Sequence, residues 1–378
     1  MRGCLVLTIK DALVHMVSKL RHTSPRLYTR ATMGPCWHGL YAAVMCLLLG
    51  AFGCTSKIED AVVISAATDR EYAEPILEAF ARRHPGTELV RQYLAETNRT
   101  VALSQLIENQ SQAPQADVLW NDEILQTLRL ENAGLLQRIS WSIPSDWPRH
   151  LRSSQGKWLG FASRARVLLI NRELLPEANS RPNSVLDLAD PQWQDRCGVA
   201  LPLAGTAATH FTILRNRMGA AQADVWFQKV SENALVLPTD RQVARAVSAG
   251  RLAFGLTDSD DALVELDAGG PVEIVFPDQR PDQSGALRIP NTVAVLANCA
   301  HPVAAAELAN YLVSPDTEGR LAMGVSGQFP ARPGHSQASR AQGDALVRWM
   351  EVDFVSAAQE WDTAAVKLHA IFGKAAAE

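Results

Sequence analysis

From residue 58 onward, short apolar runs alternate with stretches in which apolar residues recur every three or four positions. The runs at 61–65 and 116–120 and the segment 88–93 predict strands, and the stretches between them predict helices. Pro75 lies in the first helical stretch and is expected to mark its start, because proline lacks the amide hydrogen that a helix interior uses. This alternation of strand and helix predicts a parallel sheet in an α/β fold.

The same pattern continues through the second half of the chain. Apolar runs at 167–170, 198–201, 253–256 and 272–276 predict further strands. Because one domain holds about 100 to 200 residues, a chain of 378 residues predicts two.

The first 53 residues carry a different pattern. Six basic residues and one acid, Asp11, precede an apolar run at 40–52. A membrane-spanning helix needs about 20 apolar residues, so this shorter run predicts a signal peptide over 1–53 rather than an anchor helix. The run ends in a segment that resembles a bacterial lipobox, which makes Cys54 the expected site of lipidation. The alternative is a plain secreted protein in which Cys54 is structural.

Composition narrows the class of partner. Hydrophobic residues make up 47% and charged residues 20% of the chain, which excludes a disordered or collagen-like protein. Lys and Arg total 36 against 40 Asp and Glu, so the formal charge of -4 lacks the basic excess of a nucleic-acid binder. We therefore expect a small-molecule or metal ligand and no nucleic acid, with membrane contact only through the lipid anchor. A monomer is the default expectation. Cys197 and Cys299 could pair after export or remain two buried thiols.

Polar residues gather where predicted strands give way to helices, which is where open α/β sheets bind ligands. Gly205, Thr206 and Thr209 begin a helix after the strand 198–201, and bare backbone amides at a helix start favour an anion. The alternative is an ordinary helix cap formed by either threonine. His210 is expected to be packed or hydrogen-bonded rather than a metal ligand.

Two arginines and a run of acids form a second candidate site. Arg164 and Arg166 are two positions apart in a predicted strand, so both point to one face and suit a carboxylate or phosphate. Asp258, Asp260 and Asp261 lie within four residues and repel one another unless a cation or an arginine joins them. Hard-cation binding, pairing with the two arginines and helix capping are the open explanations.

Further candidate ligand-binding residues lie at two other junctions. Asn121 stands with Glu123, and Asn291 stands with Thr292. The sequence contains no metalloprotease, P-loop, Cys-x-x-Cys or serine-hydrolase motif, so we expect no enzymatic activity. A secreted hydrolase with Asp258 and Glu123 as its acid and base is the remote alternative.

Six segments in order along the chain resemble the ferric-iron type of periplasmic solute-binding protein. They are 65–71, 116–126, 160–167, 205–210, 255–262 and 289–293. The resemblance implies a two-lobed type II periplasmic binding protein of the α/β class, with a ligand cleft between the lobes. Lobe 1 would comprise 58–163 and 271–325, and lobe 2 would comprise 164–270 and 326–378. The implied partners are an ABC permease and its ATPase, and the implied location is the periplasm or the cell surface, with lipid anchoring.

The resemblance also implies the cargo. This is ferric ion with a synergistic anion at the helix start, and no resident cofactor. Iron-binding members carry two adjacent tyrosines where this chain has its acid run, so we expect Asp258, Asp260 and Glu123 to replace them, since hard cations accept several kinds of oxygen ligand. The alternative ligand is an organic anion such as a phosphonate or sugar phosphate, held by Arg164, Arg166 and the helix start.

Overall fold

The computed structural model describes residues 60–94 and 114–373, and the fold is given for these residues only. The expected signal peptide at 1–53, the expected lipidation site Cys54 and the helix expected after segment 88–93 lie outside them. Within the described ranges, no helix is both long enough and apolar enough to cross a membrane.

The first half of the structure is built on a sheet with the strand order β2-β1-β3-β10, in which β4 also pairs with β10. β1 runs parallel to β2 and β3, and β10 runs antiparallel to β3. The elements of this half are β1 (Asp60–Ala67), α3 (Arg70–Arg83), β2 (Thr87–Tyr93), β3 (Val118–Asn121), α5 (Leu125–Asn132), β4 (Leu136–Gln137), β10 (Arg288–Leu296), α10 (Pro302–Leu312) and α11 (Pro315–Met323).

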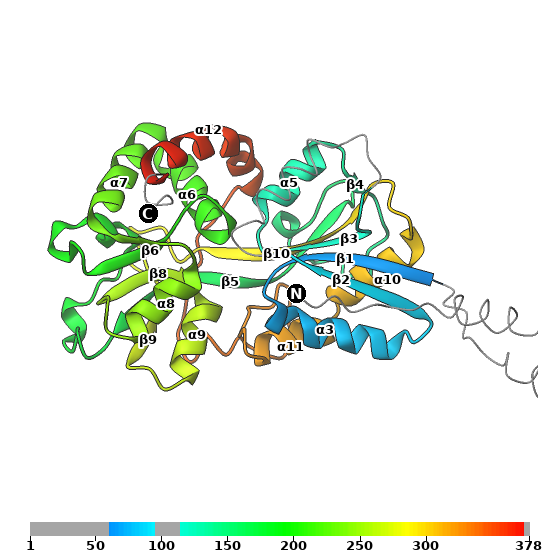
Figure 1. Ribbon diagram of the computed structural model, residues 1–378, viewed down its shortest axis with the longest axis horizontal. Coiled ribbons are helices and arrows are strands. Elements are labelled where there is room, and N and C mark those ends of the chain that lie inside the picture. Colours follow the sequence, from blue (N-terminus) through cyan, green and yellow to red (C-terminus); the bar gives the residue numbers. More distant parts are fainter. Residues whose placement is uncertain (1–59, 95–113, 374–378) are drawn as a thin grey trace, which may run out of the picture. The chain divides into compact units, whose positions relative to one another are not determined.

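Apolar residues cover both faces of this sheet, because successive residues of a strand point to opposite sides. Val293 and Val295 of β10 belong to a core that includes α3, α10 and α11. Ala294 and Leu296 belong to a second core formed with α5 and with α12 (Phe354–Phe372). Figure 1 shows α5 and α12 on one side of the strands and α3 and α11 on the other.

The second half continues the sheet in the order β5-β8-β6-β7, with β9 paired to β5. Helices α6, α7 and α12 pack on one face, and α8 and α9 pack on the other. The elements of this half are β5 (Trp158–Asn171), β6 (Cys197–Ala200), α6 (Gly205–Met218), α7 (Ala220–Asn233), β7 (Leu235–Leu237), α8 (Asp240–Ser248), β8 (Phe254–Asp258), α9 (Ser259–Asp267) and β9 (Val272–Val275).

Strand β5 joins the two halves (Figure 1). Its residues up to Ala165 pair with β10, and those from Arg166 onward pair with β8. A bridge between Ser163 and Phe329 adds a third segment to the junction. Every residue of β5 is buried, which fits a strand covered on both faces.

The predicted strand and helix rhythm is confirmed, with two corrections. The sheet is mixed rather than parallel, because the crossing strands β5 and β10 run antiparallel to their neighbours. Pro75 lies inside α3, which begins at Arg70. The helix gives up the one hydrogen bond that Pro75 cannot donate, while Ile76, Leu77 and Phe80 pack into the core and hold the helix in place.

Candidate functional site

Acidic and hydroxyl side chains from both halves converge at the carboxyl ends of parallel strands. Asp69 follows β1, Asp122 follows β3, and Asp258 ends β8. Thr206 lies in the first turn of α6, a few residues after β6. This edge is the usual ligand-binding position of an open α/β sheet, so these residues define the candidate site.

Three buried aspartates neutralise the two arginines of β5. Arg164 Nε lies 3.0 Å from Asp260 Oδ2. Arg166 Nη1 lies 2.8 Å from Asp258 Oδ1 and 2.9 Å from Asp240 Oδ1. Pairing of the acid run with the arginines, one of the explanations that the sequence left open, is therefore present.

The hydroxyl groups at the start of α6 also donate hydrogen bonds to carboxylates of the chain itself. Thr206 Oγ1 donates to Asp258 Oδ2 over 2.6 Å, and Thr209 Oγ1 donates to Glu123 Oε2 over 2.8 Å. No side chain caps the helix, so neither threonine is the expected cap. Gly205 has a φ of 59°, a left-handed conformation that favours glycine.

A small cavity lies inside this cluster. Its volume is about 20 Å³, and its walls are Asp69, Asp122, Arg164, Thr206, Asp258, Asp260 and Asp261. A space of this size holds one water molecule or a single ion, and it is far smaller than a pocket for an organic ligand. The walls hold five aspartates and one arginine, and Arg166 and Arg241 pair with Asp258 and Asp261 from outside the walls. Carboxyl oxygens therefore dominate the lining, which favours a cation.

Burial sets the protonation of these acids. It raises the pKa of Asp240 and of Asp260 to about 6 in spite of their arginine partners, and repulsion from Asp258 adds to the effect. Burial and repulsion also raise the pKa of Asp261 well above its ordinary value. Burial disfavours the charged form of Arg164, but the neighbouring aspartates outweigh it and raise its pKa. A bound cation would therefore compete with both protons and guanidinium groups.

Glu123 does not line this cavity. It precedes α5, where its carboxylate accepts the backbone N–H groups of Leu125 and Gln126. The bond from Thr209 then ties the start of α5 in the first half to α6 in the second. Burial raises the pKa of Glu123 to about 7, so its charge is sensitive to pH near neutrality.

The remaining predicted amide and hydroxyl residues form a network behind the cavity. Asn121 Nδ2 donates to Glu123 Oε1 over 3.0 Å. Thr292 bonds Thr127, which also accepts from Asn121. Asn291 is turned to the crossing strands, where its Nδ2 donates to the Ala162 carbonyl over 2.6 Å. These residues position the junction and do not line the cavity.

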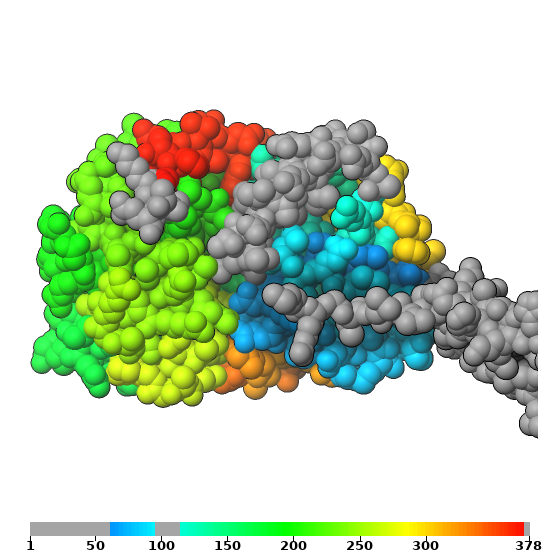
Figure 2. Space-filling view, in the orientation of Figure 1, coloured from blue at the N-terminus to red at the C-terminus, as the bar shows by residue number. Residues whose placement is uncertain are grey.

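Arg241 of α8 joins the two halves at the rim of the site. Its Nε lies 3.1 Å from Asp261 Oδ1 in its own half. Its Nη2 reaches the start of α3 in the other half, where it lies 3.1 Å from Asp69 Oδ2 and bonds Glu71 and the Tyr72 hydroxyl. Figure 2 shows the blue surface near α3 against the yellow-green surface of the second half. These contacts bridge the two halves at the rim of the site.

His210 and the two cysteines take structural positions. Both ring nitrogens of His210 are buried without a hydrogen-bond partner in the described residues, and burial keeps its pKa well below the usual value. The ring packs edge-on to Phe211, which agrees with the expected packing role. Cys197 and Cys299 are free thiols that lie in different cores, so the two do not pair.

In the described ranges, no group of three or more His, Cys, Asp and Glu side chains is arranged to hold a metal ion. In this structure Arg164 and Arg166 instead pair with carboxylate oxygens of Asp260 and Asp258. In this structure, the positive charge that neutralises the acid cluster is therefore carried by arginine.

Several members of the cluster were missed by sequence reasoning. Asp69, Asp240, Tyr72 and Arg241 were not among the candidates, although Asp69 and Asp240 each stand where a strand gives way to a helix. Open α/β sheets bind ligands where strands give way to helices, and examining those two junctions for polar residues would have found both acids. Tyr72 and Arg241 carry no such signal, because only the closure of the two halves brings them together.

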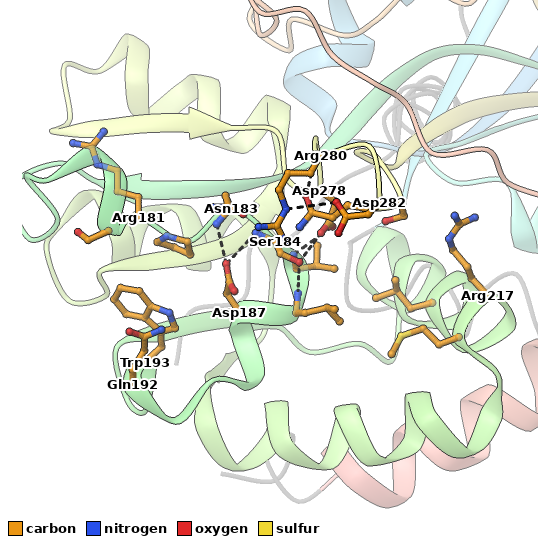
Figure 3. A pocket seen from close by; sticks show the side chains of 18 of the residues that line it. Arg181, Asn183, Ser184, Asp187, Gln192, Trp193, Arg217, Asp278, Arg280 and Asp282 are labelled. Atoms are coloured by element: carbon orange, nitrogen blue, oxygen red, sulfur yellow. Dashed lines mark hydrogen bonds and ion pairs between the residues drawn. The ribbon is translucent and has the colours of Figure 1, made fainter.

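A wider hollow of about 680 Å³ lies in the second half, away from the cluster (Figure 3). The acidic side chains of this hollow accept hydrogen bonds from the surrounding loops. Asp278 accepts from the Ser184 hydroxyl and from Val185 N–H, and Asp187 accepts from the backbone N–H of Asn183. We therefore do not assign the ligand to this hollow.

The fold and the cluster define a two-lobed α/β binding protein with its ligand site between the lobes. The model of the bacterial extracellular solute-binding protein family matches residues 122–358, which is more than half of the chain. The chain belongs to this family. Membership agrees with the expectation of a binding protein rather than an enzyme.

Individual relatives point the same way. The chain is 27% identical over 251 residues to iron uptake protein A2 of Synechocystis sp., covering 61% of this chain and 69% of that protein. It is 28% identical over 153 residues to the Fe(3+)-binding periplasmic protein of Serratia marcescens, covering 40% and 44%. The second match thus spans less than half of the relative.

The ferric binding protein from Campylobacter jejuni has a TM-score of 0.73 at 20% identity, covering 82% of this chain and 99% of that one. This structural match confirms the type II fold.

Proposed function

We propose that this chain captures ferric ion outside the cytoplasm and delivers it to an ABC permease and its ATPase. The observation that carries the proposal is the closed, acid-walled cavity of about 20 Å³ between the two halves. Carboxylate oxygens are hard ligands suited to a trivalent cation. The printed names of two relatives, an iron uptake protein and an Fe(3+)-binding periplasmic protein, support the same cargo.

The metal would be held mainly by Asp258 and Asp260 as it displaces the arginines that pair with them. Arg164 and Arg166 stabilise the acids in the absence of metal, because two adjacent buried carboxylates cannot both remain charged without a cation nearby. Glu123 is the third proposed ligand, and it would have to leave the start of α5 to take part. Tyr72 is placed beside the acids and would supply a phenol oxygen from the other half.

An accompanying anion would bind at the start of α6. The absence of a capping side chain there and the positive end of the helix support this position. Gly205, Thr206 and Thr209 are the proposed contacts, with Asn121, Asn291 and Thr292 as their supports at the junction. Thr206 and Thr209 would exchange their carboxylate acceptors for the anion.

The organic-anion alternative has weaker support. It relies on Arg164 and Arg166, whose charges are already matched by aspartates. A phosphonate or sugar phosphate also needs far more space than the cavity offers. We therefore assign the site to a cation.

The division into lobes also remains a proposal. We place 58–163 and 271–325 in lobe 1, and 164–270 and 326–378 in lobe 2. The change of β5 from β10 to β8 between Ala165 and Arg166 supports the boundary at 163. Helix α12 packs on α5 as well as on α6, so it would link both lobes. Lipid attachment at Cys54 would hold this monomeric carrier at the membrane or cell surface.

Thermal unfolding of the full chain after treatment with a chelator tests the cargo. A ligand that binds only the native state raises the midpoint. We expect a rise with ferric citrate and none with phenylphosphonate or inorganic phosphate. A rise with phenylphosphonate and none with ferric citrate would overturn the proposal, and citrate alone is the control for the carrier anion.

A further inference from the structure

A second hollow, of about 520 Å³, lies at the junction of the crossing strands. Leu151, Val352 and Phe354 supply apolar walls, and Arg288 and Trp349 supply the charged and aromatic part. We call this hollow the reverse pocket. Its volume is typical of a pocket for a small organic molecule, in contrast to the acid-walled cavity.

The strand register places the reverse pocket on the other face of the same strands. Ile289 of β10 lies opposite Arg164 of β5, and Arg288 lies opposite Ala165. Opposed residues of an antiparallel pair point to one face, and successive residues alternate between faces. Arg288 therefore points away from the face that carries Arg164 and Arg166, which we call the cleft face.

Arg288 is a cation without a neutralising partner. Its guanidinium lies 4.8 Å from the centre of the Trp349 ring, and no hydrogen bond or ion pair joins its side chain to the part of the chain that the structure describes. The charge of Glu318 acts on it, but the Glu318 carboxylate accepts the backbone N–H groups of Ala162, Ala331 and Arg332. Burial lowers the pKa of Arg288, as expected for a charge that lacks its counter-ion.

The chemistry of the walls identifies the class of ligand. A guanidinium offers a planar fork to a carboxylate, and Trp349 orients that fork by stacking on it. Glu351 is the one acid among the lining residues, and it is exposed. The guanidinium and the apolar walls together suit an anion with an apolar or aromatic body. His150, whose pKa burial and Arg288 lower, is neutral and can donate one further hydrogen bond.

We propose that the reverse pocket binds a small organic carboxylate with an apolar body, with Arg288 as its counter-ion. The site is separate from the cation site of the cleft face and does not depend on the identity of the cargo. Because its ligand would contact Ser163 of β5 and Pro290 of β10, it would bind both strands that cross between the halves.

Isothermal titration of the full chain with benzoate tests the proposal. We expect one benzoate per chain with a dissociation constant below about 1 mM. Benzyl alcohol, which lacks the charge, and inorganic phosphate, which lacks the apolar body, should bind at least about tenfold more weakly, a difference of about 1.4 kcal/mol.

Two variants locate the site. Arg288→Met keeps an apolar chain of similar length and should weaken benzoate at least tenfold, whereas Arg149→Met, an exposed arginine beside the pocket, should leave it unchanged. His150→Trp fills the rim with Arg288 intact and should also abolish binding, which decides the matter if Arg288→Met does not fold. Absence of benzoate binding by the wild-type chain, or full binding by His150→Trp and by folded Arg288→Met, would overturn the proposal.

Discussion

The two faces of the crossing strands β5 and β10 carry arginines in opposite electrostatic settings. On the cleft face, Arg164 and Arg166 are paired with buried aspartates. On the reverse face, Arg288 lies over Trp349, and no ion pair to it is found in residues 60–94 and 114–373. The number of carboxylates paired with the arginines therefore distinguishes the two faces.

This contrast shows that the charge of the preferred ligand depends on the charge that remains after arginines and aspartates of the site have paired with one another. An arginine in a cleft suggests an anion only when the chain has not already neutralised it. The cleft face has more aspartates than arginines and is suited to a cation. The reverse pocket holds Arg288, which has no ion pair in residues 60–94 and 114–373, with the exposed Glu351 as the one acid of its lining, and it is suited to an anion. Substitutions that change this balance should therefore change ligand binding more than substitutions that change shape.

The largest effect is expected from Asp258→Asn, which removes charge from the cleft face at nearly constant shape. Arg166 then keeps Asp240 as its carboxylate partner, beside its bond to the Thr206 hydroxyl, and Thr206 loses a charged acceptor. Breaking a buried pair costs about 3 to 5 kcal/mol of stability. We also expect at least about a 100-fold loss of ferric affinity, or about 2.8 kcal/mol.

Urea unfolding and titration against a competing chelator measure these two losses. The matched control is Asp282→Asn, which changes an exposed aspartate of the wider hollow in Figure 3. It should alter neither quantity. Unchanged ferric affinity in Asp258→Asn would remove this aspartate from the proposed ligand set.

The second effect concerns pH and Glu123. Its folded pKa of about 7 lies above the ordinary value, so the native state takes up a proton that the unfolded state has released. Stability is therefore greatest below about pH 4.5 as far as this group is concerned, and about 3 kcal/mol is lost as the pH rises to 7. Glu123→Gln should flatten that decline without abolishing it, because Asp240 and Asp260 also have raised pKa values.

Urea unfolding at several pH values between 4.5 and 8 measures the slope for wild type and variant. Glu232→Gln, at an exposed position of α7, is the control and should keep the wild-type slope. Ferric affinity should rise over the same range, since the metal must displace these protons. Identical slopes for wild type and Glu123→Gln would show that Glu123 does not titrate in this window.

A smaller effect is expected from Arg241→Gln, which removes the rim contacts between the halves. Pairs as exposed as these contribute about 0.2 to 1 kcal/mol each, so the fold should persist. The cleft should open more often, because Asp69 and Glu71 lose the cation that ties them to α8. Small-angle X-ray scattering should show a larger radius of gyration.

Arg245→Gln, one turn further along α8, is the matched control for the rim. It should leave the radius of gyration unchanged. If both variants scatter like wild type, the Arg241 contacts do not hold the cleft closed.

The smallest effect is expected from the cysteines, which test whether a disulfide joins the two halves. Cys197 lies in a core of the second half and Cys299 beside a core of the first, so a bridge would restrict hinge motion. Burial raises the pKa of the Cys197 thiol to about 12, which keeps it unreactive in the native state.

Mass spectrometry after alkylation with iodoacetamide measures this directly. Cys197 should be modified only after unfolding, without prior reduction. Cys299→Ser should lower the midpoint of thermal unfolding by only a few degrees, because Cys299 is partly buried at the edge of a core and serine is nearly the same size. A requirement for reductant before Cys197 reacts would mean that the thiol is oxidised.

The sequence predicted the strands and the acid and arginine clusters because these depend on local patterns. Arg164 and Arg166 share a face through strand alternation, and Asp258 and Asp260 follow the neighbouring strand. Their pairing was one of the stated alternatives. Choosing among the alternatives required the distance across the sheet, which no local pattern contains.

Other features depend on contacts between distant segments. Glu123 precedes a helix, and complete burial in the fold raises its pKa, although the bond from Thr209 of α6 opposes this rise; its own segment does not indicate such burial. Tyr72 and Arg241 meet across 169 positions of sequence. The Pro75 error has a similar cause, since packing of α3 on the sheet outweighs the local preference of proline.

The central claim is that the acid cluster of the cleft face binds the metal in place of its arginines. Crystals of the full chain loaded with ferric ion, measured at the iron absorption edge, test this most directly. We expect one anomalous peak within about 2.2 Å of carboxylate oxygens of Asp258 and Asp260, with Arg164 and Arg166 turned away from them. Loaded crystals in which both arginine pairs are intact, with the iron elsewhere or absent, would contradict the account.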